Sequence, residues 1–165
     1  MGRTLIAWVE DKPGVLNRVA SLFRRRAFNI ESLTVGHTEQ PGISRMTIVV
    51  DSDRTDVQKV AQNLYKLVNV IRVEDVTDQP AVMRDLALIR VRTNNGSRSE
   101  VMQLVDTFRA RVVDVGLNTL MIEVTGTEEK VEGLVDVIRP YGILEMVRTG
   151  RVAMVRGSKP MNNDQ

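Results

Sequence analysis

The sequence contains no cysteine and a single histidine, and these shortages exclude several kinds of chemistry. Without cysteine, the chain has no disulfide framework, no thiolate nucleophile and no cysteine-ligated metal. Because His37 is the only histidine, a histidine-based triad or metal cluster can include at most one such residue. We therefore predict no metal site, and we expect His37 to lie at the end of a strand.

Aromatic residues and long apolar runs are also scarce. Aromatic side chains make up 4% of the chain, and Trp8 is the only one within residues 5–9 and 45–51, which we predict to be central strands. RNA-recognition modules stack bases on aromatic residues of such strands, so we expect no nucleic-acid partner. No apolar run approaches the roughly 20 residues of a membrane span, and the apolar start is too short for a secretion signal. We expect a cytoplasmic protein without a membrane partner.

What is present favours a folded chain with a substantial core. Hydrophobic residues make up 42% and charged residues 27% of the sequence, and the net charge is only +2. This balance argues against a disordered protein. A length of 165 residues is compatible with one domain or with two compact ones, so the pattern along the chain must decide.

The first half of the chain switches between two hydrophobic periods. Apolar runs or alternation predict strands at residues 5–9, 30–35, 46–50 and 70–76. Helical spacing predicts two helices, whose apolar stripes are Val15, Val19, Leu22 and Phe23, and Val57, Val60, Ala61 and Leu64. Residues 40–42 predict a hairpin turn, and Asp53 is expected to cap the second helix. The resulting order is βαββαβ.

The same order recurs in the second half. Strands are predicted at residues 86–91, 112–115 and 120–124, helices around residues 101–108 and 131–138, and a last apolar stretch from 143 towards 155. We therefore predict an α+β fold of two ferredoxin-like βαββαβ domains in tandem. The expected boundaries are a first domain at 1–77, a linker at 78–84, a second domain at 85–157 and a flexible tail at 158–165.

The segment with the most specific chemistry joins the first strand to the first helix and comprises Asp11, Lys12, Pro13, Gly14, Val15 and Leu16. A helix start leaves N–H donors unpaired and carries partial positive charge, so it can bind a carboxylate. Gly14 places no side chain in the way, while Asp11 can cap the helix or receive an ammonium group. A free α-amino acid offers both poles, and Asn29 is our candidate for the second contact. Residues 11–14 have the pattern Asp-x-Pro-Gly, which also occurs as an ordinary strand-to-helix turn. The motif alone leaves both interpretations open.

Longer blocks of sequence point to a family. The strand, glycine loop and helix resemble the ACT domain, an amino-acid-sensing module. Residues 28–36 (FNIESLTVG), 44–48 (SRMTI) and 66–71 (KLVNVI) narrow the resemblance to the small regulatory subunit of acetolactate (acetohydroxyacid) synthase. Because the second half contributes 84–89 (RDLALI), 112–115 (VVDV) and 138–139 (IR), the resemblance covers nearly the whole chain.

The resemblance implies a regulator rather than an enzyme. Small subunits of this family have no active site and no cofactor of their own; they bind the large subunit, which carries thiamine diphosphate, a divalent metal and FAD. They raise its activity and confer feedback inhibition by branched-chain amino acids, usually valine. An ACT-type sensor of a different partner enzyme is an alternative, and a nucleic-acid-binding protein of the same fold is a weaker one.

The resemblance also implies where the effector binds. In the family it lies between the first domains of a homodimer. Asp11, Lys12, Pro13, Gly14, Val15 and Leu16 match the glycine loop, and Asn29 and Ile30 match the strand edge supplied by the other copy. Many relatives have Asn where this chain has Asp11. The second domain lacks an equivalent Pro-Gly-Val-Leu, so we expect no second site of this kind.

Overall fold

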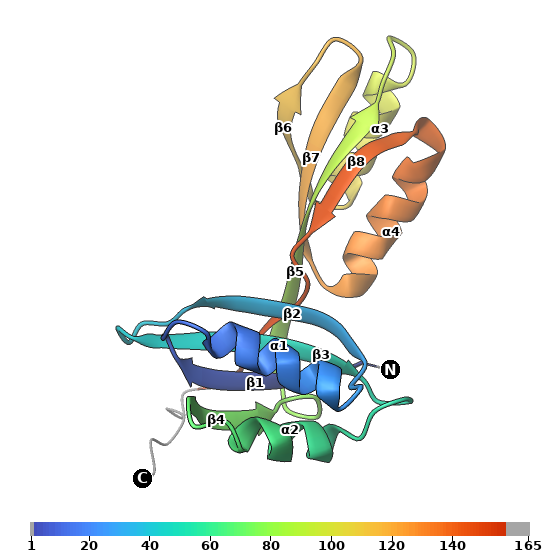
Figure 1. Cartoon of the computed structure of the whole chain (residues 1–165). Helices are drawn as coiled ribbons and strands as arrows, with labels where there is room; N and C mark the ends of the chain where they lie inside the picture. Colours follow the sequence, from blue (N-terminus) through green and yellow to red (C-terminus); the bar gives the residue numbers. More distant parts are fainter. Residues whose placement is uncertain (1, 158–165) are drawn as a thin grey trace. The chain divides into compact units, whose positions relative to one another are not determined.

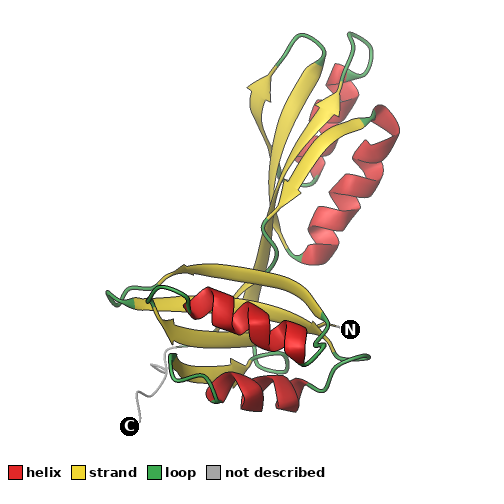
Figure 2. Ribbon diagram, in the orientation of Figure 1, coloured by secondary structure: helices red, strands yellow, loops and turns green. Residues whose placement is uncertain are grey.

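The computed structural model describes residues 2–157 and contains two compact units, each with its own sheet and helices (Figures 1 and 2). Residues 83–152 form the second unit. The first unit comprises the residues before them and, within the described part of the chain, residues 153–157 after them. The expected tail at 158–165 lies outside the described residues. The predicted α+β fold of two tandem ferredoxin-like units is confirmed.

The first unit follows the predicted βαββαβ order: β1 (Gly2–Glu10), α1 (Val15–Arg25), β2 (Ile30–His37), β3 (Ile43–Asp51), α2 (Val57–Tyr65) and β4 (Val70–Asp75). Its antiparallel sheet has the order β2-β3-β1-β4. Both helices lie on one face of this sheet (Figure 1). The predicted stripe of α1 is buried against it, which removes about 25 cal/mol of unfavourable free energy for each Å² of apolar surface.

Two local predictions in this unit can be compared with the structure. The hairpin turn at 40–42 is confirmed: the Ile43 N–H donates to the Gln40 carbonyl at 3.2 Å, and Gly42 has φ +82°. The predicted cap of α2 is wrong. Asp56, not Asp53, lies in extended conformation directly before α2, and its carboxylate accepts from the Gln58 N–H at 3.0 Å. A capping carboxylate has to reach the N–H two or three residues ahead, and only Asp56 is placed for that.

The second unit repeats the order with β5 (Ala81–Arg92), α3 (Arg98–Thr107), β6 (Arg111–Val115), β7 (Thr119–Gly126), α4 (Glu128–Ile138), a 3₁₀ turn η1 (Arg139–Tyr141) and β8 (Ile143–Arg148). The strand order is β6-β7-β5-β8, and β9 (Val152–Val155) also pairs with β5. Strand β5 begins inside the segment predicted as a linker at 78–84, and the two units divide between Val82 and Met83. The domain boundaries given above stay predictions.

The face of the first sheet that points away from the helices is also covered. Ile6 and Val49 alternate along β1 and β3 with the residues of the helix-side core, yet they are 0% and 4% exposed. Arg45 lies on the same face, and its Nη2 donates to the Ala153 carbonyl at 2.5 Å. The segment around Ala153 therefore returns to the first unit and contributes to this second layer.

The two edges of the first sheet differ in how they are protected. At β4, the Tyr65 hydroxyl accepts from the Val73 N–H at 2.9 Å and donates to the Val73 carbonyl at 3.0 Å. These are the groups that an added strand would need, so Tyr65 blocks pairing along β4. Strand β2, at the other edge, ends in three exposed residues, Val35, Gly36 and His37. The open side of this sheet is therefore β2.

Replacing Tyr65 with Phe should expose this blocked edge. Tyr65→Phe leaves the Val73 N–H and carbonyl without their partner, and we expect a loss of about 1–2 kcal/mol in the free energy of unfolding. Concentration-dependent self-association through β4 should also increase. Chemical denaturation and sedimentation velocity measure the two effects.

Tyr141→Phe is the matched control, because the Tyr141 hydroxyl donates to the Glu100 carboxylate at 2.8 Å within the second unit. Equal self-association of both variants would contradict the edge-blocking role of Tyr65.

Asp85 is the buried acidic side chain of the second unit. It is 7% exposed, its Oδ2 lies 3.7 Å from Arg148 Nη2, and its Oδ1 has no hydrogen-bond partner among the described residues. Burial raises the pKa of the Asp85 carboxyl above its ordinary value, against the opposing effect of Arg151 and Arg148. The ionised form of Asp85 therefore costs stability in the folded unit.

This pKa shift has a defined sign in stability. Because the folded pKa lies above the unfolded value of about 3.9, ionisation weakens the fold at neutral pH, and the cost disappears as pH falls through the folded pKa. We expect Asp85→Asn to be about 1 kcal/mol more stable than the parent at pH 7, with the difference vanishing near pH 4. Unfolding free energies of both chains across this range test it; a parent that is the more stable at pH 7 would show that the Arg148 contact dominates.

Candidate functional site

The loop between β1 and α1 is held in place by backbone hydrogen bonds. The Glu10 N–H donates to the Asn69 carbonyl and the Asp11 N–H to the Gly42 carbonyl, both at 2.8 Å. Gly14 then takes φ +83°, in the left-handed region that other residues rarely adopt. A Cβ at this position would meet no atom closer than 4.0 Å, so the conformation, more than space, requires glycine here.

The first turn of α1 lacks the side-chain cap that α2 and α4 have. Gly14 is its N-cap residue, no side chain caps this end, and the first turn has no acidic residue. In contrast, the Asp56 carboxylate caps α2, and the Thr127 hydroxyl caps α4 by accepting from the Lys130 N–H. The start of α1 is therefore a partially positive end with N–H donors available to an anion.

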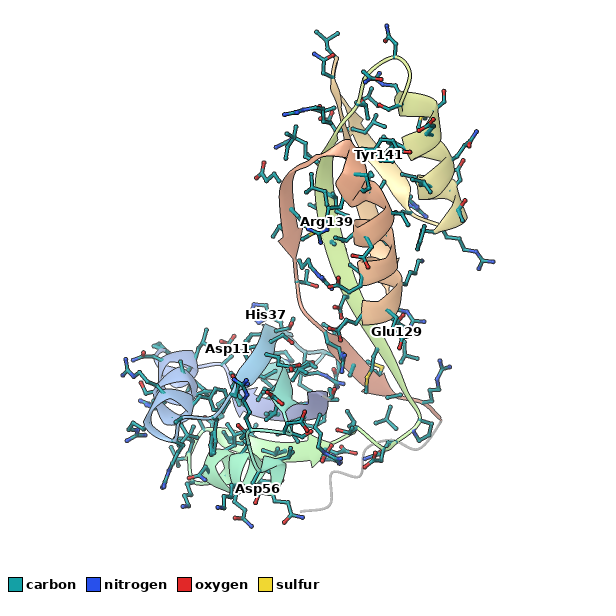
Figure 3. All side chains as sticks on the ribbon, turned by 90° about the vertical axis from the view of Figure 1, so that its right-hand side faces the viewer. Asp11, His37, Asp56, Glu129, Arg139 and Tyr141 are labelled. Atoms are coloured by element: carbon teal, nitrogen blue, oxygen red, sulfur yellow. The ribbon has the colours of Figure 1, made fainter. Side chains whose placement is uncertain are left out.

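Asp11 does not cap this helix, contrary to one of the two roles predicted for it. Its Oδ2 lies 3.4 Å from His37 Nδ1, so the loop that follows β1 and the carboxyl end of β2 lie at the same end of the sheet (Figure 3). Lys12 Nζ pairs with the Glu10 carboxylate at 2.6 Å. When His37 is protonated, it offsets the negative charge of Asp11 beside the helix start. His37 is thus a neighbour of the candidate site that the sequence interpretation missed.

The predicted loop residues differ in what their side chains face. Val15 is 5% exposed and belongs to the core, whereas Leu16 is 50% exposed beside the helix start. Leu16, unlike Val15, can therefore offer apolar side-chain surface to a ligand at this loop. Pro13 and Gly14 contribute through the course of the backbone.

Asn29 and Ile30 lie at the opposite end of the sheet from this loop within one chain. Ile30 pairs with Val50, next to Gly2 at the start of β1, whereas the loop follows the end of β1. The Asn29 Nδ2 donates to Asp51 Oδ2 at 2.9 Å, and its backbone N–H donates to the Thr55 hydroxyl at 2.9 Å. This leaves the Asn29 side-chain oxygen as the atom suited to accept from a ligand. One chain does not bring the two halves of the predicted site together.

The corresponding turn of the second unit is closed by its own residues. Asn94 Oδ1 accepts from the Gly96 N–H at 2.9 Å and the Ser97 N–H at 2.8 Å. The Arg98 guanidinium donates to the Gly116 carbonyl at 2.7 Å and the Leu117 carbonyl at 2.9 Å. These contacts tie the turn to its own unit, although Ser97 at the start of α3 makes no side-chain cap hydrogen bond.

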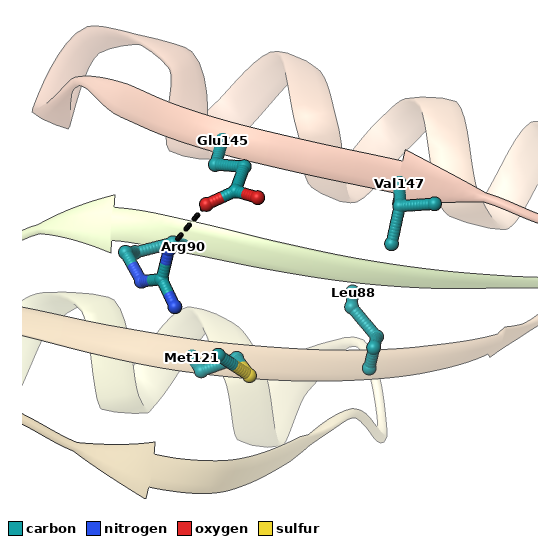
Figure 4. Close-up of a pocket in the computed structure, with 5 residues that line it drawn as sticks. All are labelled: Leu88, Arg90, Met121, Glu145 and Val147. Atoms are coloured by element: carbon teal, nitrogen blue, oxygen red, sulfur yellow. Dashed lines mark hydrogen bonds and ion pairs between the residues drawn. The ribbon is translucent and has the colours of Figure 1, made fainter.

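A small pocket lies on the second sheet instead, between strands β5, β7 and β8 (Figure 4). It encloses about 100 Å³ and is lined by Leu88, Arg90, Met121, Glu145 and Val147. The Arg90 and Glu145 side chains already form an ion pair across it. Its size and its internally paired charges do not match an amino-acid site.

Three further findings concern other possible functions. Among residues 2–157, no group of three histidine or acidic side chains could hold a metal ion. None of the helices in this range combines the length and apolar character needed to cross a lipid bilayer. The Trp8 ring already lies against the guanidinium groups of Arg45 and Arg72, whose carbons are 5.0 and 5.2 Å from its centre. This packing gives no support to base stacking on the first sheet.

Comparison with known proteins identifies both units. Residues 5–72 match the family described as an AHAS small subunit-like ACT domain, and residues 84–157 match the small subunit of acetolactate synthase. A probable acetolactate synthase small subunit of Archaeoglobus fulgidus is 54% identical over 159 residues, covering 96% of this chain and 99% of the relative. The acetolactate synthase small subunit of Mycobacterium leprae is 50% identical over 156 residues, covering 94% and 92%.

A solved structure agrees with these matches. The crystal structure of the acetolactate synthase small subunit from Thermotoga maritima superimposes with a TM-score of 0.88 at 38% identity, covering 96% of this chain and 99% of that one. Sequence and fold therefore match over almost the same residues. The chain belongs to the family of acetolactate synthase small subunits, with an ACT domain as its first unit.

Proposed function

We propose that this chain activates the large subunit of acetolactate synthase and confers feedback inhibition by valine, acting in the cytoplasm as a homodimer. The catalytic residues and the cofactors, thiamine diphosphate, a divalent metal and FAD, belong to the large subunit in this proposal. The small subunit contributes a binding site and a conformational response. The observation that carries the proposal is the uncapped start of α1 behind left-handed Gly14.

The geometry of this helix start suits the carboxylate of a free amino acid. Backbone N–H groups of the first turn and the helix dipole favour an anion there. The side-chain oxygen of Asn29 from a second copy would accept from the ligand ammonium group, because its Nδ2 already donates to Asp51. Leu16 and the other copy's Ile30 would provide apolar contact for the valine side chain.

Asp11 poses a charge problem that its neighbour reduces. A carboxylate at this loop would attract the ligand ammonium but repel the ligand carboxylate. The contact with His37 turns the Asp11 carboxylate towards the end of β2. Asp11 would then act on the ammonium side of the site, with the uncapped N–H groups left for the carboxylate.

A dimer through the β2 edges fits the two edges described above. Tyr65 blocks β4, so β2 is the edge at which a second copy can extend the first sheet. A two-fold axis makes every contact between copies occur twice, so the dimer would contain two equivalent valine sites. Valine would have to favour one arrangement of the assembly by a coupling of about 1–3 kcal/mol to regulate the large subunit.

The direct test is acetolactate formation by the cognate large subunit with and without this chain, across a valine titration. We expect the chain to stimulate the large subunit and valine to reverse the stimulation. Stimulation without valine sensitivity would contradict the effector assignment. No effect of the chain on the large subunit would overturn the proposed function altogether.

Substitutions at the two halves of the site should separate sensing from activation. Gly14→Asp would place a carboxylate on the same N–H groups that receive the ligand carboxylate, and Asn29→His would remove the oxygen proposed for the ammonium. We expect each variant to weaken valine binding by about 10-fold or more, equivalent to 1.4 kcal/mol, and to keep stimulation. Isothermal titration with valine and the activity assay provide the readouts.

Gly142→Asp is the matched control, since Gly142 has φ +102° and lies in the second unit. It introduces the same side chain at a glycine with positive φ and should leave valine binding unchanged. Normal valine binding by both site variants would place the effector elsewhere.

A further inference from the structure

The first unit also contains a groove between its two helices, to which the proposed function assigns no role. The α1–α2 groove encloses about 400 Å³ and is lined by Leu22, Arg25, Arg26, Asn63, Lys66 and Leu67. It includes none of the residues predicted to bind valine. Its lining combines a small apolar floor with three cationic side chains.

The charges of this groove are not neutralised within the chain. Arg25, Arg26 and Lys66 are exposed, and none of them forms an ion pair within the part of the chain that the structure describes. No acidic residue lines the groove. Cations near the carboxyl end of a helix interact favourably with the helix dipole, and this accounts for part of the positive charge here. The dipole effect does not, however, explain why the three side chains line one groove.

Asn63 provides a second, independent observation. It lines the groove although it is only 8% exposed, and its Nδ2 donates to the Lys59 carbonyl at 2.7 Å. Its Oδ1 is buried without a hydrogen-bond partner among the described residues. An acceptor left unpaired in this way costs free energy, so it favours an occupant that brings an N–H donor.

The surroundings of the groove favour a protein segment. Val68 directly follows the lining residue Leu67 and is 88% exposed. It offers apolar surface next to the groove, as expected for a contact with another polypeptide. The other surfaces of the first unit are already in use: Tyr65 blocks β4, the Ala153 segment lies on the sheet, and β2 is assigned to the dimer.

We propose that the α1–α2 groove is the docking surface for an acidic segment of the large subunit. Aspartate or glutamate side chains of that segment would pair with Arg25, Arg26 and Lys66. Apolar residues beside them would cover Leu67 and Val68. This inference rests on the proposed function, because it requires the large subunit as partner.

The test compares two double variants with the same change in charge. Arg25→Ala with Lys66→Ala removes one arginine of α1 and the lysine that directly follows α2 from the groove. Arg24→Ala with Lys59→Ala removes the same residue types from α1 and α2 but outside the lining. The affinity of each full-length small subunit for the purified large subunit is measured at low and at high salt, together with stimulation at saturating small subunit and valine binding.

We expect the groove variant to bind the large subunit about 10-fold more weakly at low salt, with a smaller difference at high salt. The control variant should bind like the parent, and both should keep parental valine affinity. Equal large-subunit affinity of the two variants would overturn the inference. Binding of inorganic phosphate by the parent and the groove variant is measured as well. If the groove variant binds the large subunit normally but has lost affinity for phosphate, the groove is a small-anion site and the inference is overturned.

These outcomes distinguish the inference from the proposed function. If the parent chain stimulates the large subunit and the groove variant matches it at every concentration, only the docking surface is wrong. If the parent chain itself neither binds nor stimulates the large subunit, the proposed function falls, and the docking surface falls with it.

Discussion

The antiparallel pairing of β3 with both β1 and β2 fixes where the parts of the candidate site can lie. Because β1 and β2 run parallel to each other on either side of β3, their carboxyl ends lie at the same end of the sheet, which brings His37 close to Asp11. The same pairing places Asn29, just before β2, at the opposite end of the sheet. A ligand held by both the α1 loop and Asn29 would therefore require two chains, which is why the proposed function includes a dimer.

The two units differ in the turn that precedes their first helix. In the first unit, left-handed Gly14 leaves the start of α1 without a side-chain cap. In the second, Asn94 closes the turn onto the Gly96 and Ser97 N–H groups, and Arg98 ties it to the β6–β7 connection. The fold alone does not predict the ligand site, which depends on which backbone donors remain available.

Hydrophobic periodicity predicted the order of elements and most of the core, because burial on one face imposes spacing directly on the sequence. Details set by short-range geometry were harder. Asp53 and Asp56 are both plausible caps by composition, and only the backbone at the start of α2 selects Asp56. The contact of His37 with Asp11 follows from the predicted topology and could have been found by aligning the strand ends. The Tyr65 hydroxyl on Val73 has no signal in the sequence pattern.

Helix α1 gives the proposed sites a physical connection. The proposed valine site lies at its first turn and the α1–α2 groove beside its last, and 11 residues at 1.5 Å each separate them by about 16 Å of helix. A small rotation of α1 on the sheet would alter both sites together, because Val15, Val19 and Leu22 pack against one core. If valine weakens docking of the large subunit, linkage requires that docking weakens valine binding by the same factor. Helix α1, which both proposed sites share, would be the element that carries this coupling.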